Sequence, residues 1–554
     1  MKYDKDFAED LVAEVKEDYL LRREGRRHFE AQWQLNSNFL SGNQYCAVSL
    51  AGNLEDRGKD YYWQEREVFN HIAFIVETRL AKLNRVRPVM AVRAAGSEES
   101  DAKTAKLSTK ILRSASDRLN LQELMQKGAQ WSETVGSVFY KVSWDKSAGK
   151  KVGILEGSPV HEGEVRVDVC PSYEIFPDSL SYQDVSDCQS IIHAKAVAVD
   201  DIFRIYGAMV DAEDVDTVSL ASAGVSGGMG MTGAVIKHGR GKTGGHTMVI
   251  ERYSAPSANH PDGEFAVVAG NKLLHYGPLP FRLGEDGSYA LPFIKQDSLS
   301  VAGCFFGASI VERAIPVQRA YNAVKNRKHE FLNRIAMGVL AVEDGSVDTE
   351  NLETEGLSPG KILVYRQGST PPALLDPGSV PAEFADEEDK LLNEFVLISG
   401  ISEIMRSSAL PGNLSSGAAI RLLTEQDDTR LSATAERIRM AGKKLAQFIL
   451  RLYKQFASQP RLSRVAGDGG RVELLSFIGS DLCGDDVVIE SENEFEGGAQ
   501  SRRLMLLELF KVGLFEGENG VLSAGTRAKL LEALGFGTLA EEVSVCGEGG
   551  QRNE

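Results

Sequence analysis

Apolar residues recur at helical spacing through the first 150 residues of the chain. The stretch 14–39 is charged and amphipathic and contains no proline, and in 68–83 apolar residues lie three or four positions apart. That spacing places them on one face of a helix. Two further helical patterns follow at 101–120 and 121–135. Residues 137–144 then have the β-branched and aromatic composition of a strand.

The next part of the chain has a different pattern, in which short runs of β-forming residues alternate with turn residues. Strands are predicted at 164–169, 190–193, 247–253 and 265–268. A glycine-rich stretch at 224–245 contains too few apolar residues to bury much surface. We therefore expect a loop there.

A long helix is predicted at 308–335. Its apolar stripe steps alternately by four and three positions from Ile310 to Ile335 and is interrupted only by Lys328. At about 1.5 Å per residue this helix is roughly 40 Å long. Pro316 lies inside the stripe, so we expect a kink there or a helix that begins there.

Turn residues such as Pro371-Pro372 then predict a small β-containing insertion at 336–382. A second helix, with an acidic start, is predicted at 383–401, followed by a loop and a very long helix at 418–456. One more strand is expected at 485–490. Two short amphipathic helices, at 502–512 and 524–534, precede a polar tail.

Composition is that expected of a soluble globular protein. The 554 residues correspond to roughly three or four domains, with 42% hydrophobic and 25% charged residues. No apolar run approaches the length of a membrane span, and no signal peptide is expected. Six scattered cysteines without a CxxC pair predict neither a disulfide framework nor a zinc ribbon. The net charge of -17 excludes a broadly basic nucleic-acid coat but not a local basic patch.

Catalytic motifs are absent or lack their context. A GxGxxG at 228–233 has no clear strand before it or helix after it, and the GKT at 241–243 has Ile236 where a phosphate-binding loop requires glycine. The sequence HEGEV is not a zinc-binding HExxH, because position 165 is Val165. The acidic run 386–389 suits a solvated helix start better than a metal site. We predict no enzyme activity, no cofactor and no metal site.

The two helices on either side of the insertion carry opposite charge. Residues 309–334 contain six basic and two acidic residues, whereas 383–406 contain seven acidic and two basic residues. Two interpretations stay open. One is a single antiparallel helical hairpin with neutralised faces. The other is a ring in which hairpins of many subunits stand side by side and opposite charges match between neighbours.

The order of elements resembles the portal (head-to-tail connector) proteins of tailed bacteriophages. Three stretches carry the resemblance: WQLNSNFLSGNQY at 33–45 with the helix and strand patterns after it, FGASIVERAIPVQRAYNAVKNR at 306–327, and LPGNLSSGAAIRLLTEQ at 410–426. None of these motifs is catalytic. What makes the resemblance specific is the combination of their order with the layout of helix, insertion, helix, loop and long helix.

The resemblance implies an α+β, mostly helical multidomain portal fold with wing, stem, clip and crown regions. The regions map as follows: helical part of the wing 1–150, β-rich part of the wing with the glycine-rich loop 151–307, first stem helix 308–335, clip 336–382, second stem helix 383–405, tunnel loop 406–416, long wing helix 417–457, wing strand region 458–499, and short crown and tail 500–554.

The resemblance also implies a function. Portal proteins form a homo-oligomeric ring, usually a dodecamer, at one capsid vertex of the virion, and the ring is assembled in the host cytoplasm. Double-stranded DNA passes through the central channel without sequence specificity during packaging and ejection. The implied partners are the large subunit of terminase, a head-tail adaptor and the major capsid protein, and no membrane is involved.

A channel that must release DNA cannot bind phosphates tightly, so an acidic lumen with few bases is expected. The candidate channel residues lie on the stem and the tunnel loop: Lys325, Arg327, Lys328, Arg334, Arg406, Leu410, Asn413 and Leu414. The candidates for pairing between subunits lie on the acidic helix: Glu387, Glu388, Asp389 and Glu394. The alternatives are a nucleotide-hydrolysing packaging enzyme, or a head-tail adaptor or scaffold without a channel.

Overall fold

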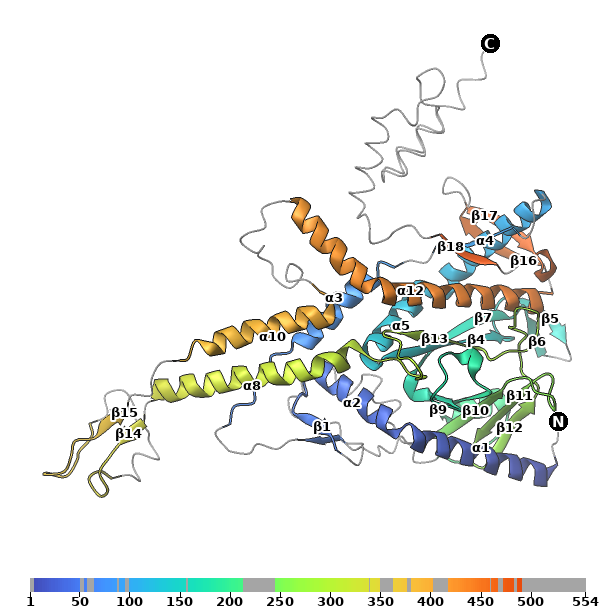
Figure 1. Cartoon of the computed structure of the whole chain (residues 1–554). Coiled ribbons are helices and arrows are strands. Elements are labelled where there is room, and N and C mark those ends of the chain that lie inside the picture. Colours follow the sequence, from blue (N-terminus) through green and yellow to red (C-terminus); the bar gives the residue numbers. More distant parts are fainter. Residues whose placement is uncertain are drawn as a thin grey trace, which may run out of the picture.

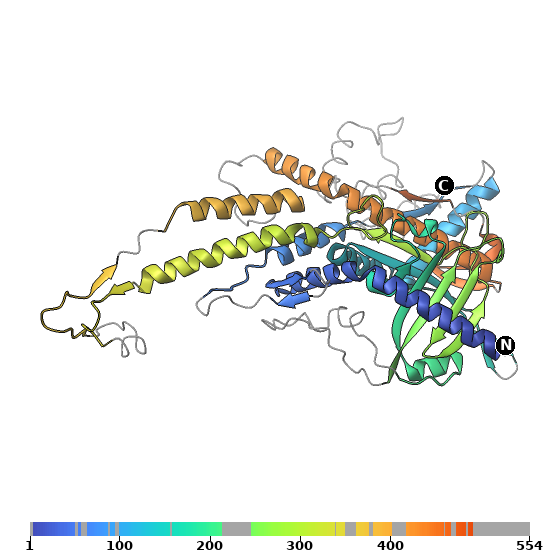
Figure 2. The ribbon, with the colours of Figure 1, turned by 60° about the horizontal axis from the view of Figure 1, so that its bottom comes forward.

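The computed structural model describes most of the chain, namely residues 4–49, 54–56, 64–86, 89–94, 99–155, 158–212, 245–337, 339–348, 362–375, 380–401, 417–458, 460–466, 472–482 and 486–490. It has a broad body of helices and sheets from which one helical hairpin projects (Figures 1 and 2). The predicted α+β class is confirmed.

Five helices belong to the first 135 residues: α1 (Lys5–Gly25), α2 (Arg27–Ser41), α3 (His71–Leu83), α4 (Glu99–Leu119) and α5 (Leu121–Val135). The helical pattern at 14–39 is confirmed, but it belongs to two helices that are separated at Arg26, which has φ -101° and ψ 7°. The side chain of Arg26 is buried and donates to the carbonyl oxygen of Ser172 at 2.9 Å. A contact with a distant part of the chain therefore sets the position of this break.

Two antiparallel sheets form the strand-rich part of the body. The five-stranded sheet has the order β12 (Lys272–Gly277), β11 (Glu264–Ala269), β10 (His246–Ser254), β9 (Ser190–Ala198), β8 (Ile175–Pro177), and the three-stranded sheet has the order β13 (Phe293–Asp297), β4 (Ser137–Asp145), β7 (Glu164–Pro171). All five strands predicted between 137 and 268 are confirmed. β13 was not predicted, because only Phe293 and Ile294 are apolar in it. Its Gln296 is nevertheless buried, where it accepts a hydrogen bond from the hydroxyl of Tyr140 at 2.9 Å.

The hairpin consists of α8 (Ile310–Met337) and α10 (Glu383–Ser399), with the short antiparallel pair β14 (Val339–Ala341) and β15 (Ala373–Leu375) at its far end (Figure 1). Of the two alternatives expected at Pro316, a kink or the start of a helix, the second is wrong, since α8 begins at Ile310 and carries this proline inside it. The second helix, predicted at 383–401, is confirmed, and residues 402–405 of the mapped stem region lie outside the described residues. α10 ends at Ser399, and Gly400 follows with φ 69°, the left-handed conformation in which helices commonly end.

Helix α12 (Gly417–Phe456) crosses the body (Figure 1). Its buried face includes Leu431, Ile438, Leu445 and Ile449, and it belongs to the largest core of the described residues. The antiparallel pair β16 (Arg461–Ala466) and β17 (Val472–Phe477) follows it, and β18 (Val487–Glu490) pairs with β3 (Val89–Val92). The long helix and the strand at 485–490 are thus confirmed.

Several predictions fall outside the described residues. They concern the glycine-rich stretch except Gly245, the loop at 406–416, and the short helices at 502–512 and 524–534. Two more antiparallel pairs complete the described sheets: β1 (Cys46–Val48) with β2 (Leu54–Asp56), and β5 (Lys151–Leu155) with β6 (Ser158–His161). Helix α6 (Val199–Tyr206) contacts β9. Among the described helices, none is long and apolar enough to cross a bilayer.

Candidate functional site

The base of the hairpin is fixed in the body by an apolar cluster. Ile310 and Val311 of α8 are 2% and 0% exposed, and they belong to one cluster with Phe39 of α2 and Ile72 of α3. Phe395 of α10 belongs to the same cluster. Both helices of the hairpin are therefore anchored near the body, while their outer halves project from it (Figures 1 and 2).

A buried ion pair adds a polar anchor at the same place. Arg79 of α3 donates to Glu133 of α5, with 2.6 Å between Nε and Oε2, and to the carbonyl oxygen of Ser399 at 2.9 Å. Ser298 donates to the other oxygen of Glu133 at 2.6 Å. The side chains of Arg79 and Glu133 are 5% and 0% exposed. Since Ser399 is the last residue of α10, Arg79 connects the body directly to the end of the hairpin.

An extended segment, residues 64–70, lies along α8 and is held by a series of contacts that we call the amide ladder. Alternate backbone N–H groups of this segment and the next helix donate to side-chain oxygens spaced four residues apart on α8: Glu65 to Glu330 at 2.9 Å, Glu67 to Asn326 at 3.0 Å, Phe69 to Asn322 at 3.1 Å and His71 to Gln318 at 3.0 Å. Two residues of an extended chain rise about 6.7 Å. Four residues of a helix rise about 6 Å. The two periods match closely enough for each contact to form.

The side-chain amides of the ladder donate hydrogen bonds through their NH₂ groups as well as accepting them through their oxygens. The Nε2 atom of Gln318 donates to the carbonyl oxygen of Phe69 at 2.7 Å, and Nδ2 of Asn326 donates to that of Glu67 at 3.0 Å. The Nδ2 atom of Asn322 donates to Gln44 at 2.7 Å. Gln318, Asn322 and Asn326 are 0%, 3% and 4% exposed. Burying such groups is favourable only because each one has a partner.

On another face of α8, two lysines contact the acidic helix. Glu388 of α10 accepts from Lys325 at 2.8 Å and from Lys328 at 3.1 Å. Burial opposes the charge of Glu388, but the two lysines outweigh it and hold the pKa of this carboxyl below its usual value. The hydrogen bond with Glu388 raises the pKa of Lys325. Opposite charges of the two helices are therefore matched within one chain, as the first of the two interpretations of the charge pattern expects.

The other candidate channel residues have different surroundings. Arg327 is exposed and forms no ion pair with a described residue. Arg334 belongs to α8, but its side chain lies outside the described part of the structure. Arg406, Leu410, Asn413 and Leu414 lie outside the described residues.

The other acidic candidates are exposed on α10. Glu387 is 3.9 Å from Lys390 one turn later, and Asp389 and Glu394 also face solvent. Pairing between subunits through Glu387, Glu388, Asp389 and Glu394 stays a prediction. The charge of Glu388, however, is already compensated within its own hairpin.

Sequence reasoning missed the ladder residues Gln318, Asn322 and Asn326. A signal was present, because polar side chains at 318, 322, 326 and 330 form a stripe with a four-residue period. The sequence does not show which segment that stripe contacts.

Comparison with known proteins gives one family match. Residues 270–490 match the family model described as Phage P22-like portal protein. This range contains the hairpin and α12. The match confirms, for this part of the chain, the resemblance to portal proteins of tailed bacteriophages.

Curated proteins and solved structures give no further support for a family. No curated protein matches the chain. Among solved structures, a chain of the "Neck of empty GTA particle computed with C6 symmetry" is 11% identical, with a TM-score of 0.37 over 84% of this chain and 90% of that chain. At this TM-score the likeness carries no argument.

Proposed function

We propose that this chain is a phage portal protein, which forms a ring-shaped channel for double-stranded DNA at one vertex of a capsid. The observation that carries the proposal is the family match over 270–490. That range includes α8, α10 and α12 in the order expected for the two stem helices and the long wing helix. In the virion, the ring connects the head to the tail.

The shape of the hairpin supports this proposal. The 28 residues of α8 extend about 42 Å at 1.5 Å per residue, and the hairpin projects from the body (Figure 2). Hairpins of about twelve subunits standing side by side would enclose a hole. The exposed side chains of Arg327, Glu387 and Glu394 are then available to face a neighbouring subunit or the lumen.

The ion pairs of the hairpin suit a channel that does not retain DNA. Phosphate contacts by free lysines give strong binding without sequence specificity, which would oppose movement. Glu388 pairs with both Lys325 and Lys328 and offsets one of their two positive charges, so neither lysine is a free cation. We infer that Arg327 is the stronger candidate for a phosphate contact, together with Arg334 and Arg406.

The remaining regions follow from the same proposal. The insertion 336–382, with β14 and β15 at the far end of the hairpin, would be the clip that meets the large subunit of terminase and later the head-tail adaptor. The body would be the wing, and residues 406–416 the tunnel loop. The major capsid protein would surround the wing.

Imaging and mass measurement of the purified full chain test the proposal. We expect a closed ring of about twelve copies with a central pore in negative-stain images. A particle of one copy, or a closed assembly without a pore, would contradict the proposal and favour an adaptor or scaffold. Sustained nucleotide hydrolysis that Lys242→Ala abolishes would favour the packaging enzyme instead.

Charge variants of the hairpin test which residues line the wall. Arg327→Glu should weaken retention of double-stranded DNA by the assembled ring at low salt, because it removes an exposed positive charge from the stem. Lys390 is also an exposed basic residue of the hairpin but lies on α10. The same charge reversal there, Lys390→Glu, serves as the matched control. Equal DNA retention by wild type and Arg327→Glu removes Arg327 from the channel residues.

A further inference from the structure

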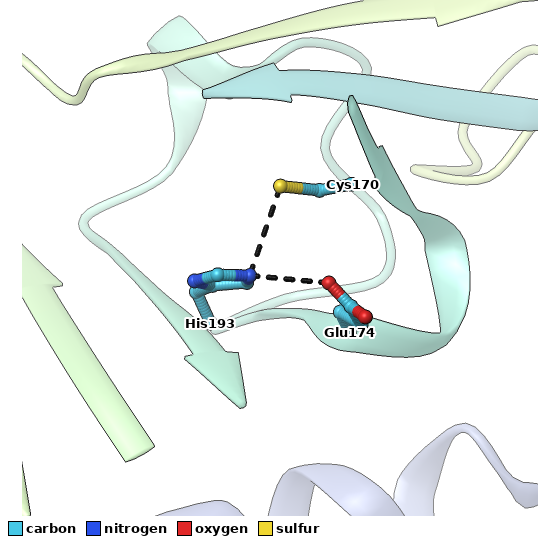
Figure 3. A group of neighbouring side chains, drawn as sticks. All are labelled: Cys170, Glu174 and His193. Atoms are coloured by element: carbon cyan, nitrogen blue, oxygen red, sulfur yellow. Dashed lines mark hydrogen bonds and ion pairs between the residues drawn. The ribbon is translucent and has the colours of Figure 1, made fainter. Parts of the chain in front are cut away.

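Three side chains with metal-binding atoms converge inside the body, away from the hairpin. Cys170 lies near the end of β7, Glu174 lies in the short 3₁₀ turn η1 (Ser172–Glu174), and His193 lies in β9. Their donor atoms all lie within 4.8 Å of one another. Figure 3 shows Cys170 and Glu174 directed toward the same ring nitrogen of His193.

Two of the three distances between ligand atoms fit tetrahedral coordination, and the third is at most 4.8 Å. Nε2 of His193 is 3.7 Å from Sγ of Cys170 and 3.3 Å from Oε2 of Glu174. Around a tetrahedral zinc ion with a Zn–S bond near 2.3 Å and Zn–N and Zn–O bonds near 2.0 Å, neighbouring ligand atoms are separated by about 3.3–3.6 Å. We propose that Cys170, Glu174 and His193 bind a divalent metal ion that accepts thiolate and imidazole ligands, with Zn²⁺ as the best fit.

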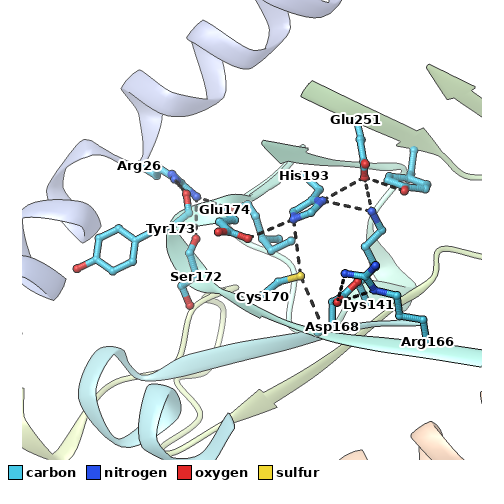
Figure 4. A network of polar contacts seen from close by, with 12 residues as sticks. Arg26, Lys141, Arg166, Asp168, Cys170, Ser172, Tyr173, Glu174, His193 and Glu251 are labelled. Atoms are coloured by element: carbon cyan, nitrogen blue, oxygen red, sulfur yellow. Dashed lines mark hydrogen bonds and ion pairs between the residues drawn. The ribbon is translucent and has the colours of Figure 1, made fainter. Parts of the chain in front are cut away.

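A second group of side chains orients the histidine. Oε2 of Glu251 is 3.1 Å from Nδ1 of His193, on the side of the ring opposite the cluster. Metal-binding histidines commonly donate their other N–H group to a carboxylate in this way. When Nδ1 carries the proton and donates to Glu251, the lone pair of Nε2 faces Cys170 and Glu174. Tyr253 donates to the same oxygen of Glu251 at 2.9 Å, and Lys141 contacts it as well (Figure 4).

The turn that carries Glu174 is held in place before any ligand binds. The buried guanidinium of Arg26 donates to the carbonyl oxygens of Ser172, Tyr173 and Ile175 (Figure 4). Its Nε atom donates to Glu30 at 2.8 Å. Because Arg26 fixes the backbone on both sides of Glu174, little conformational entropy remains to be lost when this carboxylate binds an ion.

The charges of the cluster favour a cation. Cys170 and Glu174, which both become anionic when they lose a proton, lie on the Nε2 side of His193. Lys141 forms an ion pair with Glu251, so a thiolate and one carboxylate remain to balance a divalent ion.

Such an ion would connect the two sheets of the body. β7 belongs to the three-stranded sheet and β9 to the five-stranded sheet. The side chain of Glu174 is 17% exposed, so water can occupy the fourth position. This inference is independent of the proposed function, and it reverses the prediction of no metal site. No sequence pattern indicates this site, because the ligands come from two sheets and a turn rather than from a short motif.

Metal analysis of the purified full chain tests the proposal. The chain is incubated with Zn²⁺, dialysed and measured by mass spectrometry of the metal, and we expect about one ion per chain. Replacement by Co²⁺ should give the absorption bands of a tetrahedral cobalt–thiolate site. Cys170→Ala and Glu174→Gln should each weaken Zn²⁺ binding more than about 100-fold, and Glu251→Gln about 10–100-fold.

Cys188→Ala provides the control, because this cysteine is also buried but lies outside the cluster. It should bind zinc like the wild type. Should Cys170→Ala fail to fold by circular dichroism, Glu174→Gln decides, since its partly exposed side chain tolerates this substitution. Wild-type protein without bound metal after dialysis, or Cys170→Ala and Glu174→Gln with wild-type affinity, would overturn the proposal.

Discussion

The polar contacts that anchor the base of the hairpin to the body differ from those between its two helices, which join Lys325 and Lys328 to Glu388 and which we call the shaft contacts. At the base, Arg79 and Glu133 are almost fully buried, and the ladder residue Asn322 is only 3% exposed. On the shaft, Lys325 and Lys328 are 24% and 26% exposed where they contact Glu388. Water and salt reach the shaft contacts more easily. The base therefore fixes the geometry, whereas the shaft contacts respond to the solution around them.

The largest expected effect is at the buried ion pair. Arg79→Met leaves Glu133 buried without its cationic partner and removes the contact with the carbonyl oxygen of Ser399. Loss of one partner of a buried pair costs about 3–5 kcal/mol. We expect a large drop in the denaturation midpoint of the full chain. The double variant Arg79→Met/Glu133→Gln should recover part of that loss, and no recovery would contradict the assignment.

The amide ladder should have the next largest effect. Asn322→Ala leaves the N–H group of Phe69 without its acceptor and the Oε1 atom of Gln44 without its donor, and each unsatisfied buried group costs about 1–3 kcal/mol. Amide hydrogen exchange of residues 64–71 should become faster. Ala323→Ser, at an exposed position one residue away, is the matched control. Unchanged exchange in Asn322→Ala would show that the ladder does not hold the segment.

The shaft pair should have a smaller effect that depends on pH. The pKa of Glu388 is lowered in the folded chain. Its contribution is therefore complete above its unfolded pKa of about 4.3, and it is lost as the pH falls through the lower, folded pKa. Glu388→Gln should cost about 1 kcal/mol at pH 7 and should differ less from wild type at pH 3. A difference that grows on acidification would contradict this sign.

The smallest effect is expected at the exposed acidic residues of α10. Glu387→Gln should change the stability of the isolated chain by less than about 0.5 kcal/mol, because its contact with Lys390 is exposed and 3.9 Å long. Its effect on ring formation should be larger if neighbouring hairpins pair through this face. Measuring both stability and assembly of Glu387→Gln distinguishes a role between subunits from a role within the chain.

The parts of the fold predicted from sequence are those with strong local patterns. Helix α8 follows from a long apolar stripe, α12 from a long stretch without proline, and β4, β9 and β10 from compact β-forming runs. These signals lie within the elements themselves, so the neighbours need not be known.

The parts that could not be predicted depend on distant contacts. The break at Arg26 depends on carbonyl groups about 150 residues later in the chain. Gln296 is a poor strand residue by propensity, and a hydrogen bond with Tyr140 makes its burial in β13 possible. The cluster of Cys170, Glu174 and His193 exists only when two sheets come together. Local sequence patterns contain none of this information.

The four-residue period of the ladder restricts how α8 can shift. A displacement of α8 along residues 64–70 by a fraction of a turn would break all the contacts of the ladder together, because they share one period. New contacts become available only after a full step of about 6 Å, comparable to one-turn ratchets between packed elements in other proteins. The helix and the segment beside it should therefore move as one rigid unit or by whole steps.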